Sequence, residues 1–308
     1  MRGNGPIVKH SSNDRRLRLP DGRRLGYAEF GVLDGQPVIY MHGLPASRLE
    51  ARIADRAARK VGIRIISPDR PGMGLSDFQT GRTLSAWSED VGHLADSLYL
   101  ERFSLLGVSG GGPYALACAS SMSRRLRAVG LVGALGPMAV PHLGRSMKPP
   151  ARFSFHLARN FPRLSRLLYG ELIGRLLRQW PDLVTLLLQP AEADRPVLAD
   201  PDVSVILTNS IKEALRQGGQ GPVRDLQLLG EEWDFDLNRI DCPVHLWHGE
   251  QDATVPIVMG RYLAHVIPGC QSRFYKKEGH FSLPVGHMEE ILSDISSGVG
   301  RGSIKNLV

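Results

Sequence analysis

The stretch Gly107-Val108-Ser109-Gly110-Gly111 decides how we interpret this chain. It follows the apolar run 103–106 and precedes the helix-forming run 114–119. A serine on a sharp turn between a strand and a helix needs very small neighbours, because the strand end and the helix start approach closely. Glycine flanks the serine on both sides, at Gly107 and at Gly110 and Gly111. The pattern therefore predicts a strained turn that presents the hydroxyl of Ser109 as a nucleophile.

Strand and helix patterns alternate on both sides of this turn. Short apolar or β-branched runs predict strands, and longer stretches with apolar residues near a period of 3.6 predict helices. The alternation predicts an α/β fold with a mostly parallel sheet of about eight strands, flanked by helices. The expected strands are 16–19, 25–30, 37–41, 63–67, 103–107, 128–132, 244–248 and 272–275, and the expected helices include 47–61, 84–98, 256–266 and 288–295.

The alternation stops after Gly136-Pro137. The next hundred or so residues are helical in composition, contain no convincing strand and are interrupted by prolines. We therefore predict a helical cap inserted at 137–236 into a core made of 1–136 and 237–308. Apolar residues of this segment suggest an apolar substrate pocket, although we expect most of them to pack between helices and only a minority to touch the ligand. They are Met138, Phe153, Phe155, Leu167, Leu168, Trp180 and 186–188.

A serine hydroxyl becomes a good nucleophile only when a base takes its proton and an acid orients that base. Asp252 follows the expected strand 244–248, and His280 follows the expected strand 272–275. The carboxyl ends of parallel strands meet at one edge of a sheet, which is also where Ser109 lies. The sequence thus predicts a catalytic triad of Ser109, Asp252 and His280.

Other acids and histidines lie near the same strands. Asp241 precedes its strand and belongs to the opposite edge of the sheet, whereas Glu250 is a candidate for a solvent-facing loop residue. His245, His248 and His287 are interpreted as hydrogen-bonded structural residues.

The oxyanion of an acyl-transfer intermediate needs two hydrogen-bond donors that are already in position. The residue after the nucleophile supplies one, which here is the backbone N–H of Gly110. The loop His42-Gly43-Leu44-Pro45 leaves an earlier strand at the same edge of the sheet. We expect the backbone N–H of Leu44 to be the second donor.

These motifs together resemble the α/β-hydrolase superfamily, in particular its HGxP-bearing, cap-containing bacterial serine hydrolases. The resemblance covers nearly the whole chain. It rests on 42–45, on Asp69-Arg70-Pro71-Gly72-Met73-Gly74-Leu75-Ser76, on the turn at Ser109, on Asp252 before Val255-Pro256, and on Gly279-His280. In such proteins the loop at 69–76 is generally structural, and we interpret Arg70 and Ser76 as residues that brace it.

The identity of the nucleophile separates the activities of that superfamily. Dehalogenases and epoxide hydrolases of this kind use a carboxylate, whereas this chain has Ser109, which disfavours both activities. We expect hydrolysis of a carboxylic ester, or of a related thioester or lactone, of a small to medium apolar substrate through an acyl-enzyme. The alternatives are a carbon–carbon bond hydrolase, a perhydrolase with the same triad, and a small-molecule receptor that does not turn over its ligand.

Composition bounds the remaining possibilities. The three cysteines, Cys118, Cys242 and Cys270, show no metal-binding spacing, and this chemistry requires no cofactor and no metal. The N-terminus lacks the apolar region of a signal peptide, so the expected location is cytoplasmic. No nucleic-acid-binding motif is present, the expected partner is a small-molecule substrate, and the oligomeric state is not predictable.

Positive charge is concentrated in the cap, although the net charge of the whole chain is only +7. The segment from Pro141 to Trp180 contains eight basic residues and only one acidic residue, Glu171. We interpret them as a solvated helical surface, with a surface for a membrane or an anionic ligand as the alternative. The basic residues are Arg145, Lys148, Arg152, Arg159, Arg163, Arg166, Arg175 and Arg178.

Overall fold

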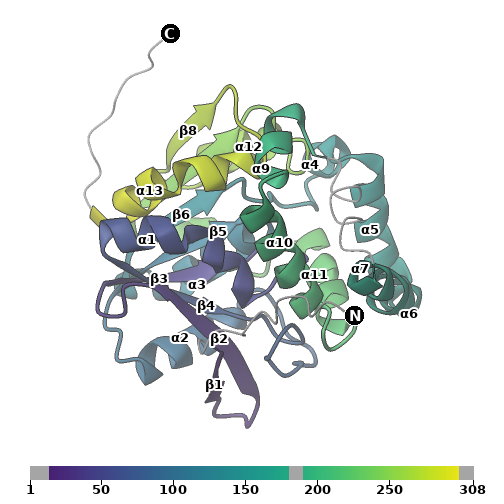
Figure 1. Ribbon diagram of the computed structural model, residues 1–308, viewed down its shortest axis with the longest axis horizontal. Coiled ribbons are helices and arrows are strands. Elements are labelled where there is room, and N and C mark those ends of the chain that lie inside the picture. The colour runs from purple at the N-terminus through teal and green to yellow at the C-terminus, as the bar shows by residue number, and fades with distance from the viewer. Residues whose placement is uncertain (1–13, 180–189, 298–308) are drawn as a thin grey trace, which may run out of the picture.

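The computed structural model describes residues 14–179 and 190–297, and its core is one eight-stranded sheet (Figure 1). The strand order is β1-β2-β4-β3-β5-β6-β7-β8. From β4 to β8 all neighbours pair in parallel, whereas β2 is antiparallel to β1 and β4. The predicted sheet is confirmed. Its strands are β1 (Arg15–Arg18), β2 (Arg24–Gly31), β3 (Gln36–Met41), β4 (Ile63–Pro68), β5 (Phe103–Val108), β6 (Leu126–Val132), β7 (Val244–Gly249) and β8 (Gln271–Tyr275).

Helices cover both faces of the sheet. Successive side chains of a strand point to opposite faces, so Leu105 packs into one apolar core and Leu106 into the other. The helices α2 (Trp87–Ser97), α3 (Gly112–Met122) and α12 (Ile257–Val266) cover the first face, and α1 (Asp55–Val61) and α13 (Ser282–Ser297) cover the second. Two sequence-based boundaries were imprecise. A 3₁₀ segment, Arg48–Ala54, precedes α1, and α13 begins six residues before the expected position 288 because Pro284 fits its first turn.

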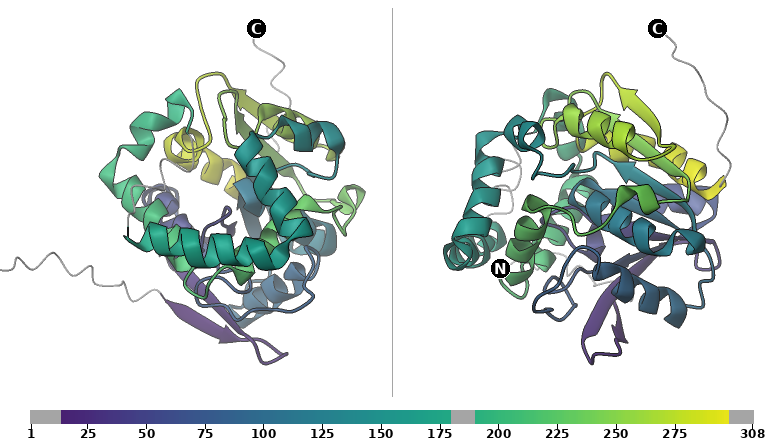
Figure 2. Two further views of the ribbon diagram at one scale, coloured as in Figure 1. Left: turned by 90° about the vertical axis from the view of Figure 1, so that its right-hand side faces the viewer. Right: turned by 180° about the vertical axis from the view of Figure 1, so that it is seen from behind.

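The segment between β6 and β7 consists of helices joined by turns and loops, and its described residues contain no strand. Helices α10 and α11 lie between the sheet and the outer helices α5, α6 and α7, and Figure 2 (left) shows the segment from its outer side. The cap boundaries at 137 and 236 stay a prediction, and Trp180 and 186–188 lie outside the described residues. The helices are α4 (Pro141–Ser146), α5 (Pro149–Asn160), α6 (Pro162–Arg166), α7 (Gly174–Gln179), α9 (Arg195–Leu198), α10 (Pro201–Ala214) and α11 (Gln220–Gly230), with a π-helical turn at Leu167–Ile173 and short 3₁₀ turns at Ser109–Gly111, Ser123–Arg125, Glu192–Asp194 and Leu237–Arg239.

Candidate active site

Ser109 lies on the turn between β5 and α3 with a φ of 54°. This left-handed conformation is uncommon for a residue with a side chain and marks a strained position. The flanking glycines make the turn sterically possible. A Cβ on Gly107 would lie 2.8 Å from the carbonyl oxygen of Gly111, and a Cβ on Gly111 would overlap the carbonyl oxygen of Met41. The local sequence therefore holds the serine at the carboxyl end of the sheet.

The structure brings Ser109, His280 and Asp252 into one hydrogen-bonded chain. The Oγ of Ser109 lies 3.0 Å from Nε2 of His280, and Nδ1 of His280 lies 2.7 Å from Oδ2 of Asp252. Because a carboxylate only accepts hydrogen bonds, Nδ1 carries the proton and the lone pair of Nε2 faces the serine hydroxyl. The other oxygen of Asp252 accepts the backbone N–H groups of Thr254 and Val255, at 2.9 and 2.7 Å. This geometry suits proton transfer from Ser109 to His280.

The environment of His280 raises its pKa above 6.5. Burial of the ring acts in the opposite direction and is the largest single influence, because desolvation disfavours the imidazolium. The carboxylate of Asp252 more than offsets it through charge and the hydrogen bond, and Asp194 and Glu50 add to the effect through their charges. The ring is thus surrounded by groups that stabilise its protonated form.

The competing acids and histidines do not reach Ser109. Glu250 forms an exposed ion pair with Arg261, and Asp241 lies at the other end of β7. Nε2 of His248 lies 3.5 Å from Oδ2 of Asp252 and 2.9 Å from the carbonyl oxygen of Val255. Burial lowers the pKa of His248, so this ring is a neutral support for Asp252.

The other two histidines have structural surroundings as well. His287 lies 3.3 Å from both Glu278 and Glu290, whereas His245 stacks on Trp247 and its Nε2 has no hydrogen-bond partner among the described residues. The structure gives His245 a stacking contact, and its hydrogen-bonded role stays a prediction.

The loop that carries Leu44 is held from two sides. Arg70 donates to the carbonyl oxygens of His42 and Gly43, and Glu50 accepts the N–H of Gly43 at 2.9 Å. Leu44 lies against the serine turn, since a Cβ on Gly110 would be 3.0 Å from Cβ of Leu44. The two predicted oxyanion donors, Leu44 and Gly110, are therefore neighbours beside Ser109.

The loop at 69–76 forms the bracing contacts that its sequence suggested. Ser76 donates to the carbonyl oxygen of Asp69 at 2.7 Å, and the Asp69 carboxylate accepts Arg48 at 2.8 Å. Arg70 also connects this loop to the cap, because its Nε donates to Asp225 of α11 at 2.6 Å. Burial acts to raise the pKa of Asp225, but Arg70 and Arg82 lower it to about 2.

Asp194 is a residue of this site that the sequence did not indicate. It lies in the inserted segment, is fully buried and accepts the backbone N–H groups of His280, Phe281 and Ser282 at 3.1, 2.8 and 2.9 Å. Its carboxylate occupies the space that a Cβ on Gly279 would need. A residue of the segment between β6 and β7 thus fixes the loop that carries the candidate base, and it also forms the N-terminal cap of α13.

A pocket of about 70 Å³ opens onto Ser109 and His280. Its walls are mostly apolar, with contributions from Leu44, Val108 and Phe281. The cap contributes Leu207, Ser210 and Ile211 of α10, and none of the described cap residues that the sequence suggested. This agrees with the expectation that most of those residues pack between helices, since α10, and not α5, lies beside Ser109.

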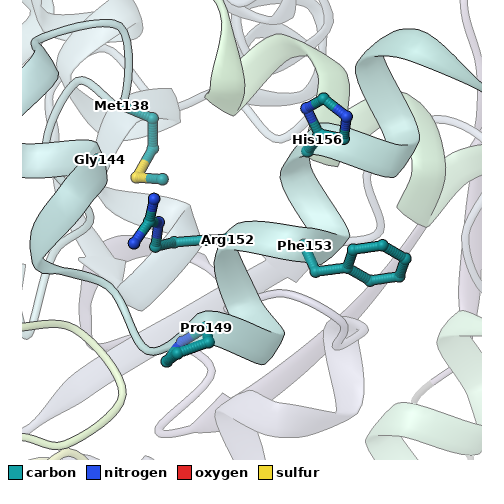
Figure 3. A pocket seen from close by; sticks show the side chains of 6 residues that line it. All are labelled: Met138, Gly144, Pro149, Arg152, Phe153 and His156. Carbon is teal, nitrogen blue, oxygen red and sulfur yellow. The ribbon is translucent and has the colours of Figure 1, made fainter.

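A second hollow, of about 520 Å³, lies within the cap (Figure 3). Met138, Gly144, Pro149, Arg152, Phe153 and His156 line it. It is larger than the pocket at Ser109, but neither Ser109 nor His280 lines it. We therefore assign the chemistry to the smaller pocket.

The basic cap residues lie at the surface. Arg145, Arg152, Arg159, Arg163 and Arg166 are exposed, alongside exposed apolar side chains such as Phe161 and Leu167. No helix among the described residues is long and apolar enough to cross a bilayer. Contact of this surface with an anionic membrane stays a prediction, which sedimentation with liposomes at low and high salt would test.

Known proteins similar to this chain identify its family. A family model described as the alpha/beta hydrolase fold matches residues 36–286. This chain belongs to the α/β-hydrolase family. The α/β-hydrolase is 27% identical to a non-heme chloroperoxidase of Kitasatospora aureofaciens, over 89% of this chain and 95% of that protein.

Solved structures show the same fold for this α/β-hydrolase. An esterase from Exiguobacterium antarcticum superposes with a TM-score of 0.68 at 20% identity, covering 92% of this chain and 98% of that one. A bromoperoxidase from Bacillus anthracis superposes with a TM-score of 0.65 at 20% identity, covering 92% and 99%. At this identity the likeness concerns the fold alone.

Proposed function

We propose that this α/β-hydrolase cleaves a carboxylic ester, or a related thioester or lactone, of a small to medium apolar substrate. In this proposal Ser109 is the nucleophile and His280 is the general base and acid. Asp252 orients the ring of His280 and stabilises its protonated form. The observation that supports it most strongly is the hydrogen-bonded chain from Ser109 through His280 to Asp252 at the wall of a mostly apolar pocket.

The proposed reaction has two halves. Nε2 of His280 takes the proton of Ser109 while Oγ attacks the carbonyl carbon, and the resulting oxyanion binds to the N–H groups of Leu44 and Gly110. When the intermediate collapses, the leaving alcohol takes the proton from His280 and the acyl group stays on Ser109. Water then attacks the acyl-enzyme, gives a proton to His280, and the acid leaves as Oγ recovers that proton.

The pocket beside Ser109 favours a short acyl group. It encloses about 70 Å³. One water needs at least roughly 10–15 Å³ of such space, so the pocket accommodates only a few heavy atoms. We expect activity to be highest on acetate to butyrate esters and to fall for longer chains.

The test is a series of p-nitrophenyl esters from acetate to palmitate, with labelling by a fluorophosphonate probe. Wild type is compared with Ser109→Ala and with Ser121→Ala, a serine on α3 that donates to the carbonyl oxygen of Ala117. Turnover and labelling should both vanish in Ser109→Ala and persist in Ser121→Ala. A folded wild type that is not labelled would contradict the proposal and favour a receptor that binds its ligand without turnover.

A second candidate is perhydrolysis with the same triad. The similarity to a protein named a non-heme chloroperoxidase favours it. Hydrogen peroxide would replace water in the attack on the acyl-enzyme, so that the products are a peracid and the regenerated serine. Acetate, hydrogen peroxide and bromide should then brominate an organic dye in the presence of wild type but not of Ser109→Ala. Equal bromination by both proteins would exclude this candidate.

A further inference from the structure

A buried carboxyl group, Glu50, lines the pocket that holds Ser109. Glu50 is 8% exposed and belongs to the 3₁₀ segment Arg48–Ala54 that follows the loop at 42–45. Most other lining residues are apolar, so the carboxyl group differs in character from the walls around it. Glu50 is neither a member of the proposed triad nor one of the proposed oxyanion donors.

The two oxygens of Glu50 have different surroundings. Oε1 accepts the N–H of Gly43 at 2.9 Å and the hydroxyl of Tyr40 at 3.1 Å. Oε2 accepts no hydrogen bond from the described residues. It lies 3.2 Å from the position that a Cβ on Gly43 would take, and Cβ of Ser109 lies 3.5 Å from the same position. Oε2 and the nucleophile therefore border one small space.

An acceptor in this place affects which substrates the pocket takes. A wholly aliphatic acyl group would cover Oε2 without offering it a hydrogen bond, and an unpaired polar group under apolar cover is costly. An ionised Glu50 would also oppose formation of the oxyanion next to it, although burial raises the pKa of this carboxyl group. A hydroxyl or ammonium group on the substrate would satisfy Oε2, and an ammonium group would also offset the negative charge.

We propose that Glu50 is a specificity-determining residue, whose Oε2 accepts a hydrogen bond from a hydroxyl or ammonium group close to the scissile carbonyl of the substrate. The inference rests on the proposed function for the identity of the scissile bond. Its observational support is the difference between the two oxygens of one side chain: Oε1 holds the loop at 42–45, and Oε2 borders the small space next to Ser109.

Glu50→Gln separates these two tasks. The amide oxygen of Gln can still accept Gly43 and Tyr40, while its NH₂ group replaces the acceptor Oε2 by a donor. The matched control is Glu213→Gln, which makes the same chemical change at a partner of Arg48 that does not line the pocket.

The substrates are isosteric esters. Propionate, glycolate and glycinate esters differ only in a terminal CH₃, OH or NH₃⁺ group, and the pair 3-hydroxypropionate and butyrate places the donor one carbon further away. Methoxyacetate against butyrate offers an acceptor in place of a donor. For each pair we take the ratio of kcat/KM for the first ester to kcat/KM for the second. The ratio for wild type is then divided by the ratio for the variant, which cancels the intrinsic reactivity of each ester.

We expect Glu50→Gln to lower the preference for donor esters over propionate or butyrate by about 10- to 100-fold, as for a hydrogen bond to a charged group. The preference for methoxyacetate over butyrate should rise, and Glu213→Gln should change neither ratio. A larger effect for glycinate than for glycolate would identify the ammonium group as the ligand, and the reverse would identify the hydroxyl.

Unchanged ratios in a folded Glu50→Gln variant would overturn the proposal, because a carboxyl group that stays protonated would donate as the amide does. Loss of activity toward all esters alike would also overturn it, in favour of a bracing role alone. If fluorophosphonate labelling fails, the proposed function fails. The dissociation constants of the same esters for Ser109→Ala, with and without Glu50→Gln, then still show whether Glu50 selects donors.

Discussion

Ser109 and His280 face each other across 3.0 Å, but the chain fixes them by different means. Ser109 is held by sterics within its own turn, where glycines allow β5, α3 and the end of β3 to touch. His280 is held by hydrogen bonds to Asp252 and to Asp194, the latter 86 residues earlier in the chain. Damage on the serine side should therefore affect folding, whereas damage on the histidine side should affect catalysis.

The largest effect on the histidine side is expected from Asp252→Asn. An amide can donate to Nδ1 of His280, which would place the ring proton on Nε2 and remove the lone pair that faces Ser109. We expect kcat on p-nitrophenyl acetate to fall by roughly 10³- to 10⁴-fold. Asp241→Asn, at the other end of β7, is the control. A loss of less than tenfold would show that Asp252 does not govern the tautomer of His280.

On the serine side, Gly111→Ala should destabilise the protein by about 3 kcal/mol or more, since its Cβ meets backbone that cannot move freely. Urea unfolding measures this free energy. Gly286→Ala is the control, because a Cβ on Gly286 in α13 meets nothing within 4 Å. That variant should gain up to about 1 kcal/mol from helix propensity. Equal stabilities of the two variants would contradict steric control of the turn.

Asp194→Ala should lower kcat by about 10- to 100-fold with little change in KM, because the loop that positions His280 loses three hydrogen bonds. The acid limb of the pH profile should also move to lower pH, since the charge of Asp194 contributes to the raised pKa of His280. Asp200→Ala removes the N-cap of α10 and is the matched control. A purely structural role would lower the stability of both variants by about 1 kcal/mol and leave both pH profiles unchanged.

The smallest effect concerns wild type alone. His280 accepts the serine proton only when it is neutral, so kcat/KM should fall as the pH drops through its pKa. Because that pKa is raised, the midpoint of the acid limb should lie above pH 6.5. A pH profile of ester hydrolysis with a midpoint at or below 6.5 would contradict the described surroundings of His280.

The contrast between local sterics at Ser109 and long-range hydrogen bonds at His280 also explains which features the sequence could predict. The glycines around Ser109, the loop at 42–45 and the strand-end positions of Asp252 and His280 are local patterns, and the structure brings those residues together. The sheet followed from alternating strands and helices in the same way.

Asp194 could not be found by such reasoning. Its partners are backbone N–H groups, which leave no pattern of side chains in the sequence. The residues next to Asp194 also suggest a different role. An aspartate two residues before Pro196 is typical of a local helix cap, yet Asp194 makes no capping bond to α9 and caps α13 instead. Glu50 was missed for a similar reason, since the local sequence shows a helical acid and not the pocket that it borders.

The pairing of Asp225 with Arg70 and Arg82 limits how far α11 can move away from the sheet. Lifting α11 away from the sheet would strand two buried guanidinium groups without their counter-charge, at a cost of roughly 3–5 kcal/mol. Arg70 would also lose a partner that helps to orient it toward the loop at 42–45. Helix α11 is therefore held in place by buried charge pairs, and we expect the outer helices α5, α6 and α7 to move more readily than α11.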